Sequence, residues 1–339
     1  MNLKKSFKGT NWIPASLNDG WIYNDEITNS NHLQSVLEFL ASKYDHSSRE
    51  EWSERIKKGE VTINKKNASG TLKLKKGDLL SWSRPPWEEP SIPSKWDIIF
   101  DNQDILIINK PAGLPTTPGG GFIKHTLTEL LKKKYTKFGN NSIPKPVHRL
   151  GRYTSGLLVC ARRKDTRAAL SKLFRTNASS PSSFRRIYLA LAHKNQTLQL
   201  GQSLDIQTPI SKCFHPFMGE IWNIASQNHE WSEQYNQETT NLRSHTQIKL
   251  IEKRQNADLL EINIFTGRPH QIRIHLASIG TPLLGDPLYK ANGEISTSAT
   301  PGDGGYFLHA HKLLNIPIKG QLCSFEARVP VILRKKYIN

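Results

Sequence analysis

Short apolar runs closed by glycine and proline are the feature that most constrains how this chain folds. The clearest, Leu-Leu-Val-Cys-Ala at 157–161, directly follows a polar and basic stretch at 146–156. A second run, at 105–108, ends at Pro111 and Gly113. Apolar runs of about four to eight residues with such boundaries are typical of buried strands. Both are far shorter than the roughly 20 residues that a membrane-spanning helix needs. The pattern therefore predicts buried strands and no membrane segment.

The charge balance indicates an anionic partner. Among 339 residues, 47 are Lys or Arg and 29 are Asp or Glu, which gives a formal net charge of +18. Such a surplus is commonly used to neutralise a phosphate backbone and release its counterions, and a membrane surface is the competing partner. The start of the chain is polar and contains lysines, without the apolar core of a signal peptide. We therefore expect a cytoplasmic protein that binds nucleic acid and no membrane.

Six stretches follow one another in a characteristic order, and the loop at 146–156 is the second of them. This loop reads Pro-Val-His-Arg-Leu-Gly-Arg-Tyr-Thr-Ser-Gly. The others are Asp-Ile-Leu-Ile-Ile-Asn-Lys-Pro-Ala-Gly-Leu-Pro at 104–115, Arg-Ile-Tyr-Leu-Ala-Leu at 186–191, Thr-Gly-Arg-Pro-His-Gln-Ile-Arg-Ile-His-Leu at 266–276, Gly-Thr-Pro-Leu-Leu-Gly-Asp-Pro-Leu-Tyr at 280–289 and Leu-His-Ala at 308–310. In this order the blocks resemble the RluA-type pseudouridine synthases, and they span roughly residues 98 to 330.

Gly151 is the departure from the family pattern. The family carries an aspartate directly after His-Arg-Leu, which acts on the ribose as nucleophile or base. Between residues 145 and 175 the only carboxylate is Asp165, fourteen positions beyond Gly151. The chain thus resembles a subgroup with glycine in place of the catalytic aspartate. We expect Asp286 to be a structural turn residue, and Arg273 to face an unpaired position unless another carboxylate reaches it.

The resemblance also implies roles for individual residues. The catalytic set would be Tyr188, which stacks on the uracil, Arg273, which faces the family carboxylate, and Gly151, where that carboxylate is missing. Tyr188 and Arg273 also have simpler interpretations. Tyr188 could be a core-packing residue, and Arg273 could be one of several charged residues on a strand. The residues expected to bind RNA are Arg149, which would fill the place of a flipped base or only touch phosphate, together with Arg152, Arg268, His270, Gln271, Lys110, Lys57 and Lys58.

For the fold, the resemblance implies an α+β domain with a mixed, largely antiparallel central sheet and flanking helices. Apolar residues at helical spacing predict a helix at 165–174 after the loop. Residues 215–245 indicate an excursion between two strands, in which Trp222 and Trp231 either stack on RNA or tether the excursion. We expect an N-terminal extension at 1–30, a small RNA-binding-like module at 31–83, a proline-rich linker at 84–97 and the synthase-like domain at 98–335.

The cysteines and histidines suggest no metal or disulfide chemistry. Cys160, Cys213 and Cys323 are widely separated and show no paired metal-ligand spacing. His309 and His311 have no Cys, Asp or Glu nearby to complete a set of ligands. We expect no metal and no cofactor, because the isomerisation that the resemblance implies needs none.

Three functions remain open at this stage. The first is an isomerase that flips a uridine out of structured ribosomal or transfer RNA and converts it to pseudouridine. The second is a catalytically silent RNA-binding protein that keeps the flipping pocket. The third, a different activity on a nucleotide or a small anion, has no constellation of residues to support it. No protein partner is implied.

Overall fold

The two apolar runs form neighbouring strands at the centre of the protein. In the computed structural model, 105–108 lies in β10 (Ile105–Lys110) and 157–161 in β12 (Thr154–Ala161), and the two strands pair antiparallel. Both are buried along almost their whole length, as their composition predicts. The structure describes residues 11–44, 46–139, 142–175, 184–215, 218–225, 241–299 and 304–335.

The chain divides into two units. The smaller holds Ala15–Glu89, and the larger holds Pro90–His215 and Glu220–Asn339 together with the first residues. The division after Glu89 lies within the proline-rich segment 84–97. Two short strands of that segment pair with strands near the start of the chain: β7 (Glu88–Glu89) with β2 (Ser16–Leu17), and β8 (Ile92–Pro93) with β1 (Trp12–Ile13).

The small unit is a four-stranded sheet with two helices, α1 (Val36–Lys43) and α2 (Arg49–Lys57). Its strands lie in the order β3 (Trp21–Glu26), β6 (Leu79–Arg84), β4 (Val61–Ile63), β5 (Lys66–Asn67). Strand β3 lies in the range 1–30, so the unit begins earlier than the expected module. Both helices open with a capping box, in which Ser35 and Ser48 exchange hydrogen bonds with the glutamate three residues on. The fully buried Trp52 anchors the core.

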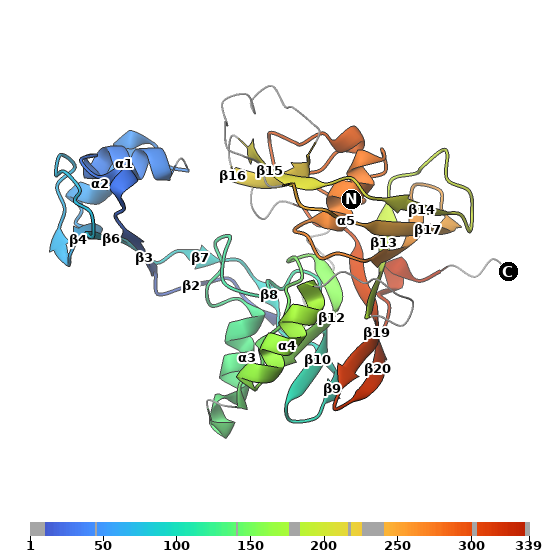
Figure 1. The fold of residues 1–339 in the computed structure, drawn as a ribbon. Helices are drawn as coiled ribbons and strands as arrows, with labels where there is room; N and C mark the ends of the chain where they lie inside the picture. Colours follow the sequence, from blue (N-terminus) through green and yellow to red (C-terminus); the bar gives the residue numbers. More distant parts are fainter. Residues whose placement is uncertain are drawn as a thin grey trace. The chain divides into compact units, whose positions relative to one another are not determined.

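The large unit is built on a sheet of ten described strands (Figure 1). The main path runs β14 (Ser203–Ile206), β17 (Thr246–Lys253), β18 (Asp258–Ile264), β13 (Arg185–Ala192), β19 (Leu308–Ile318), β12, β10, β9 (Asp97–Asp101). Strands β11 (Lys145–Pro146) and β20 (Gln321–Glu326) pair with β12 and β19. In this sheet the described pairing of β12 with β19 is parallel and the others are antiparallel. The expected mixed, largely antiparallel α+β fold is confirmed.

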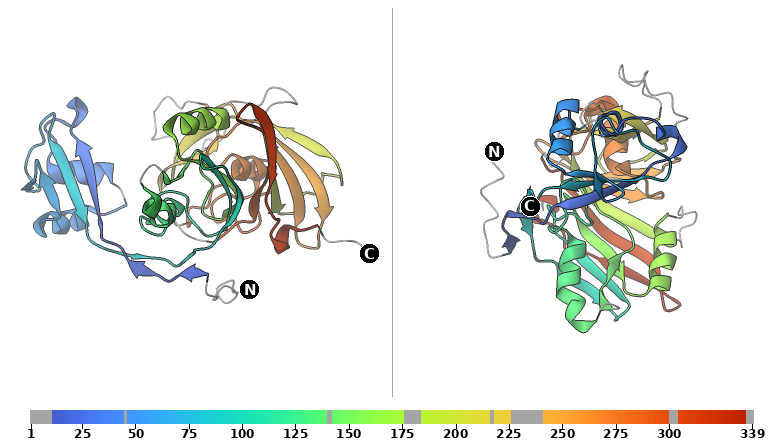
Figure 2. Two further views of the ribbon diagram at one scale, coloured as in Figure 1. Left: turned by 90° about the horizontal axis from the view of Figure 1, so that it is seen from below. Right: turned by 90° about the vertical axis from the view of Figure 1, so that its left-hand side faces the viewer.

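Three of the described α-helices cover the sheet of the large unit. α3 (Leu127–Tyr135) packs on the face that carries Leu106 and Leu158, whereas α4 (Lys164–Arg175) packs on the opposite face, beside Ile107 and Val159. Figure 2 shows the strands between these two helices. The predicted helix 165–174 is therefore confirmed to within one residue at each end. α5 (Gln271–Ser278) packs against β17 and β18.

The segment 215–245 is described only in part. β15 (Ile210–His215) and β16 (Gly219–Ile224) form a separate two-stranded sheet, and Trp222 lies in β16. The backbone carbonyl of Trp222 accepts a hydrogen bond from the Tyr289 hydroxyl at 2.7 Å, so β16 contacts the body of the unit. Trp231 lies outside the described residues. Among the helices that the structure describes, none is long and apolar enough to cross a bilayer.

Candidate active site

Strand β19 brings two of the sequence blocks together. Ala310 pairs with Gly156 of β12 on one side and with Tyr188 of β13 on the other. Since neighbouring strands lie about 4.8 Å apart, the end of the loop at 146–156, here called the signature loop, lies roughly two strand spacings from Tyr188. Gly156 has φ of +104°, and a Cβ atom there would stand 2.2 Å from the carbonyl oxygen of Ala310. Only glycine permits this close approach.

The loop before β12 is fixed by hydrogen bonds to its surroundings. His148 stacks on Phe174 with 4.0 Å between ring centroids, and its Nε2 accepts the backbone N–H of Val159 at 3.1 Å. Burial, and secondarily the charge of Arg186, lower the pKa of His148 to about 3. The neutral ring keeps the lone pair that accepts this bond. The carbonyl of Leu150 accepts a hydrogen bond from the Thr116 hydroxyl at 2.8 Å. Hydrogen bonds with Val159 and Thr116 therefore fix the part of the loop that directly precedes Gly151.

Tyr306 occupies the space beside Gly151. A Cβ atom built on Gly151 would stand 2.4 Å from the Tyr306 hydroxyl oxygen, far inside contact distance. The Tyr306 side chain is buried, and its oxygen accepts a hydrogen bond from the Thr154 hydroxyl at 3.3 Å. Sequence reasoning missed Tyr306, which stands two residues before the Leu-His-Ala block. No local pattern links it to a loop that precedes it by about 150 positions.

Arg273 is paired, because another carboxylate, that of Asp286, reaches it. It lies on helix α5 and not on a strand, and its Nε and Nη2 both donate to the carboxylate of Asp286 at 2.6 Å. Asp286 also accepts the backbone N–H groups of Leu288 and Tyr289, at 3.0 and 3.1 Å. It is therefore a turn residue, as expected, and also the counter-ion of Arg273. A buried charge needs such a partner, because an uncompensated one is strongly destabilising.

Two aromatic rings enclose the Arg273 guanidinium. Its central carbon lies 4.6 Å from the ring centroid of Tyr306 and 4.8 Å from that of Tyr289. Burial by itself opposes the charge, but the hydrogen bonds and the negative charge of Asp286 raise the pKa of Arg273 above its usual value. Arg273 is thus a rigid cation at neutral pH. Tyr306 consequently links Gly151 on the loop to the ion pair on α5.

Tyr188 reaches the same region from β13. Its half-buried ring packs against the cluster that contains Tyr306 and Leu308, and also against the cluster that contains Leu150. Burial raises the pKa of its hydroxyl, so the group is a neutral phenol at neutral pH. The residues expected to be catalytic therefore converge on one region: Tyr306 contacts both Gly151 and Arg273, and Tyr188 packs against the cluster that contains Tyr306.

Lys110 does not lie on an RNA-binding surface, contrary to expectation. Its side chain is 0% exposed, and the ammonium nitrogen donates to the backbone carbonyls of Pro111, Leu114 and Arg152 at 2.9, 2.8 and 3.2 Å. Burial lowers the pKa of Lys110 to about 7. Because these acceptors belong to two loops, Lys110 fixes the turn after β10 to the signature loop.

Gln271 is likewise structural. Its side chain is buried, the amide oxygen accepts from the Thr266 hydroxyl and the Arg268 backbone N–H, and the amide nitrogen donates to the backbone of His245 and the hydroxyl of Thr246. These four bonds use the full capacity of the amide oxygen and nitrogen. No donor or acceptor remains for RNA.

The other expected contacts of the large unit differ in accessibility. Arg152 is half-buried, donates to the carbonyl of Gly113 at 3.3 Å, and lies 4.5 Å from the ring centroid of Phe122. Arg149 and His270 are exposed, and Arg268 is half-buried. His270 adopts the left-handed conformation (φ +53°) at the start of α5, and its Nδ1 lies 2.8 Å from the Tyr289 hydroxyl. Arg149, Arg268 and His270 therefore keep the exposure that a contact with RNA requires.

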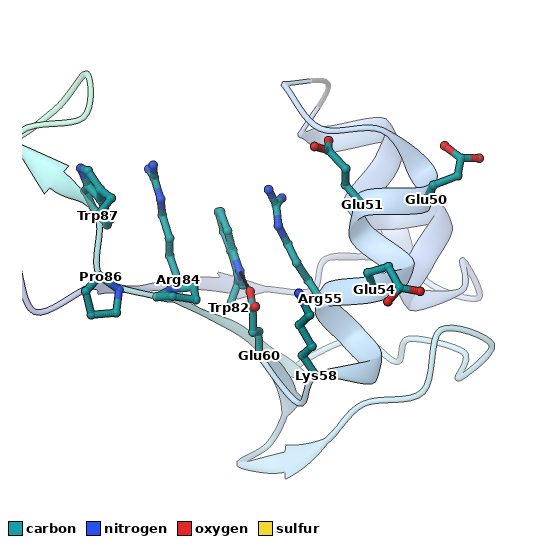
Figure 3. Close-up of a pocket in the computed structure, with 11 residues that line it drawn as sticks. Glu50, Glu51, Glu54, Arg55, Lys58, Glu60, Trp82, Arg84, Pro86 and Trp87 are labelled. Carbon is teal, nitrogen blue, oxygen red and sulfur yellow. Dashed lines mark hydrogen bonds between the residues drawn. The ribbon is translucent and has the colours of Figure 1, made fainter.

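The expected RNA-binding lysines of the small unit lie at the end of α2. Lys57 makes an exposed ion pair with Glu54 at 2.8 Å. Lys58 helps to line a hollow of about 550 Å³ (Figure 3). The lining mixes three cations with four carboxylates and two indole rings, namely Arg55, Lys58, Arg84, Glu50, Glu51, Glu54, Glu60, Trp82 and Trp87. Because the lining carries both positively and negatively charged side chains, the hollow itself is not a basic patch.

Within the described parts of the chain, no group of three or more His, Cys, Asp or Glu side chains is placed to hold a metal ion. His309 instead lies beside β12, with its Nδ1 2.9 Å from the Ser155 hydroxyl. Burial lowers the pKa of His309 to about 4.

Comparison with known proteins decides the family. The family model described as RNA pseudouridylate synthase matches residues 104–278, which include β10, the signature loop, Tyr188 and the whole of α5. This chain belongs to the RNA pseudouridylate synthase family. As a pseudouridylate synthase it is an isomerase, and the alternative of a silent RNA-binding protein is not favoured.

Similar sequences extend this pseudouridylate synthase match beyond the central domain. An uncharacterized RNA pseudouridine synthase of Synechocystis is 36% identical over 82% of this chain and 88% of its own length. RNA pseudouridine synthase 5 of Arabidopsis thaliana is 32% identical over 94% of this chain and 95% of its own length. Among solved structures, human RNA pseudouridylate synthase domain containing 1 aligns with a TM-score of 0.50 and 22% identity, over 71% of this chain and 87% of that one. This last likeness concerns the fold alone.

Proposed function

We propose that the site around Tyr188, Tyr306 and Arg273 isomerises uridine to pseudouridine in structured ribosomal or transfer RNA. The convergence of Tyr188, the signature loop and Arg273 supports this proposal most directly. In a folded RNA the glycosidic bond is shielded by stacking and pairing, so the nucleotide has to be flipped out at a cost of a few kcal/mol. The uracil would stack on Tyr188, and the exposed Arg149 would fill the place that the base leaves.

The surface charge supports a polyanionic substrate. The formal charge of +18 favours contact with phosphate groups. Arg149 follows His148 in the signature loop, and Arg268 and His270 shortly precede Arg273; Arg149 and His270 are exposed, and Arg268 is half-buried. Lys58 and the neighbouring lysines of the small unit would add contacts outside the site. We place the reaction in the cytoplasm, which contains structured ribosomal and transfer RNA.

Chemical mapping of pseudouridine tests the proposal. Purified protein is incubated with unmodified ribosomal and transfer RNA, and modified positions are mapped before and after incubation. We expect conversion at one or a few uridines, and a loss of about 100-fold or more in Tyr188→Phe and Arg273→Ala. The matched control is Tyr135→Phe, a buried tyrosine at the end of α3, which should convert RNA as the wild type does. Tight RNA binding without any conversion would contradict the proposal and leave an RNA-binding protein.

A further inference from the structure

We infer that the hydroxyl of Tyr306 takes the place of the missing carboxylate and acts as the base of the reaction. This inference rests on the proposed function and adds to it the identity of the reacting group. It starts from the position of one oxygen atom. The Tyr306 oxygen lies 2.4 Å from the Cβ position of Gly151. In an aspartate, Cβ and a carboxylate oxygen are separated by one C–C bond of about 1.5 Å and one C–O bond of about 1.2 Å, hence by about 2.4 Å across the angle.

The oxygen of Tyr306 therefore stands at the distance from residue 151 at which an aspartate there would place its own oxygen. Glycine is required for this arrangement, because any Cβ atom at 151 would collide with the phenol. The absence of a side chain at 151 and the position of the tyrosine oxygen at 306 are thus sterically linked. Gly151 has no left-handed φ, so the conformation of the loop does not by itself require glycine.

The surroundings of the oxygen suit a proton acceptor. The Thr154 hydroxyl donates to it, so the phenol receives a hydrogen bond on the side facing the loop. The Arg273 guanidinium lies over the ring, 4.6 Å from its centroid. A donated hydrogen bond and a cation over the ring both stabilise the negative charge that the oxygen carries once it has released its proton. Asp286, in contrast, already accepts four hydrogen bonds and is committed to Arg273 and to its own turn.

The reaction can be written with this one base. Tyr306 enters the cycle as the phenolate, after its proton has passed to solvent water. The phenolate oxygen removes the proton from ribose C2′, the electrons of that C–H bond form the C1′–C2′ double bond, and the C1′–N1 bond breaks with its electron pair on the uracil. The uracil turns within the site. The phenol then returns its proton to C2′, the uracil C5 bonds to C1′, and the proton on C5 moves to N1. The atoms balance as an isomerisation, no cofactor is consumed, and Tyr306 ends as it began.

Three variants and one labelled substrate test this role. Tyr306→Phe keeps the ring over which Arg273 lies and removes only the oxygen, so RNA affinity should stay within about twofold while conversion falls by about 100-fold or more. Gly151→Asp alone should also lose conversion, because the new side chain meets the Tyr306 oxygen. In Gly151→Asp/Tyr306→Phe that oxygen is absent, and conversion should recover at least about tenfold over Tyr306→Phe. RNA deuterated at ribose C2′ should react about twofold or more slowly with the wild type.

The outcomes separate this inference from the proposed function. Conversion by the wild type together with equal conversion by Tyr306→Phe would overturn the role of Tyr306 and leave the proposed function standing. The same holds if the double variant is no more active than Tyr306→Phe, or if deuteration at C2′ leaves the rate unchanged. Absence of conversion by the wild type on every RNA would overturn both. Tyr135→Phe again serves as the control for removing a buried phenol oxygen.

Discussion

At the residue scale, the site is defined by side chains that compensate for one another. Gly151 carries no side chain, and the Tyr306 hydroxyl occupies the space beside it. The buried guanidinium of Arg273 is compensated by the carboxylate of Asp286. Each compensation joins residues that are distant in sequence or lie on different elements. The residues around Gly151 therefore fit a glycine at this position.

The Arg273–Asp286 pair yields a prediction about stability. Asp286→Asn removes the charge that compensates a guanidinium buried between two rings, so the free energy of unfolding should fall by about 3 kcal/mol. Urea unfolding followed by tryptophan fluorescence measures it. The matched control is Glu54→Gln, which breaks the exposed Lys57–Glu54 pair and should leave unfolding unchanged within error. Equal effects of the two substitutions would show that burial of the pair is irrelevant.

At the element scale, the register of three strands positions the chemistry. β19 lies between β12 and β13, and Ala310 opposes both Gly156 and Tyr188. A slip of one residue in either pairing would turn the side chains of that strand to the opposite face of the sheet. Tyr188 would then leave the cluster that contains Tyr306. The close contact of Gly156 with Ala310 is consequently part of what places Tyr188 in the site.

Gly156→Ala tests this arrangement. The added methyl group would stand 2.2 Å from the Ala310 carbonyl oxygen, at a residue whose φ of +104° already disfavours a side chain. We expect a loss of about 3 kcal/mol or more in unfolding free energy, together with loss of conversion. In the control Gly201→Ala, φ is +82° and nothing lies within 4 Å of the added carbon, so only the backbone strain of about 1 kcal/mol remains. If Gly156→Ala lowers the free energy of unfolding no more than Gly201→Ala does, β12 and β19 can move apart to admit the methyl group.

At the scale of the whole molecule, charge governs how RNA is recognised. The positive surplus of the chain implies that several phosphate groups are neutralised on binding, with release of their counterions. RNA affinity should therefore weaken by about 100-fold or more between 50 and 200 mM salt. Titration of fluorescent RNA at several salt concentrations measures the slope of log K against log salt. The slope should become shallower by about one unit when an exposed contact such as Arg149 is replaced by Gln. A slope near zero would exclude an electrostatic interface.

The buried histidines make the whole fold sensitive to acid. Burial lowers the pKa of His275 and of His309 to about 4, and that of His148 to about 3. In the unfolded chain each titrates at its ordinary value near 6.5, so below this pH the unfolded state binds more protons than the folded state. The contribution of these histidines to the free energy of unfolding should be constant above pH 7 and should fall as the pH drops from about 6.5 to 4. Denaturant unfolding at successive pH values measures this.

A matched variant isolates one contribution to this acid sensitivity. His309→Gln cannot take up a proton, and its amide can still hydrogen-bond with the Ser155 hydroxyl that lies 2.9 Å from Nδ1 in the wild type. Its stability should therefore fall less steeply between pH 6.5 and 4 than that of the wild type. An unchanged slope would mean that His309 is protonated in the folded state.

The sequence by itself determined the strands at 105–108 and 157–161, the helix near 165–174, and the family to which the chain belongs. These features depend on local periodicity and on ordered motifs, and a linear sequence contains both in full. Only the tertiary structure decided that Lys110 and Gln271 are buried structural residues, that Asp286 pairs with Arg273, and that Tyr306 stands beside Gly151. Periodicity and polarity indicate which faces are buried, but not which distant side chain completes a site. That choice depends on strand order and on packing between separate elements and loops, whether their residues lie 13 positions apart, as Arg273 and Asp286 do, or 152, as Thr154 and Tyr306 do.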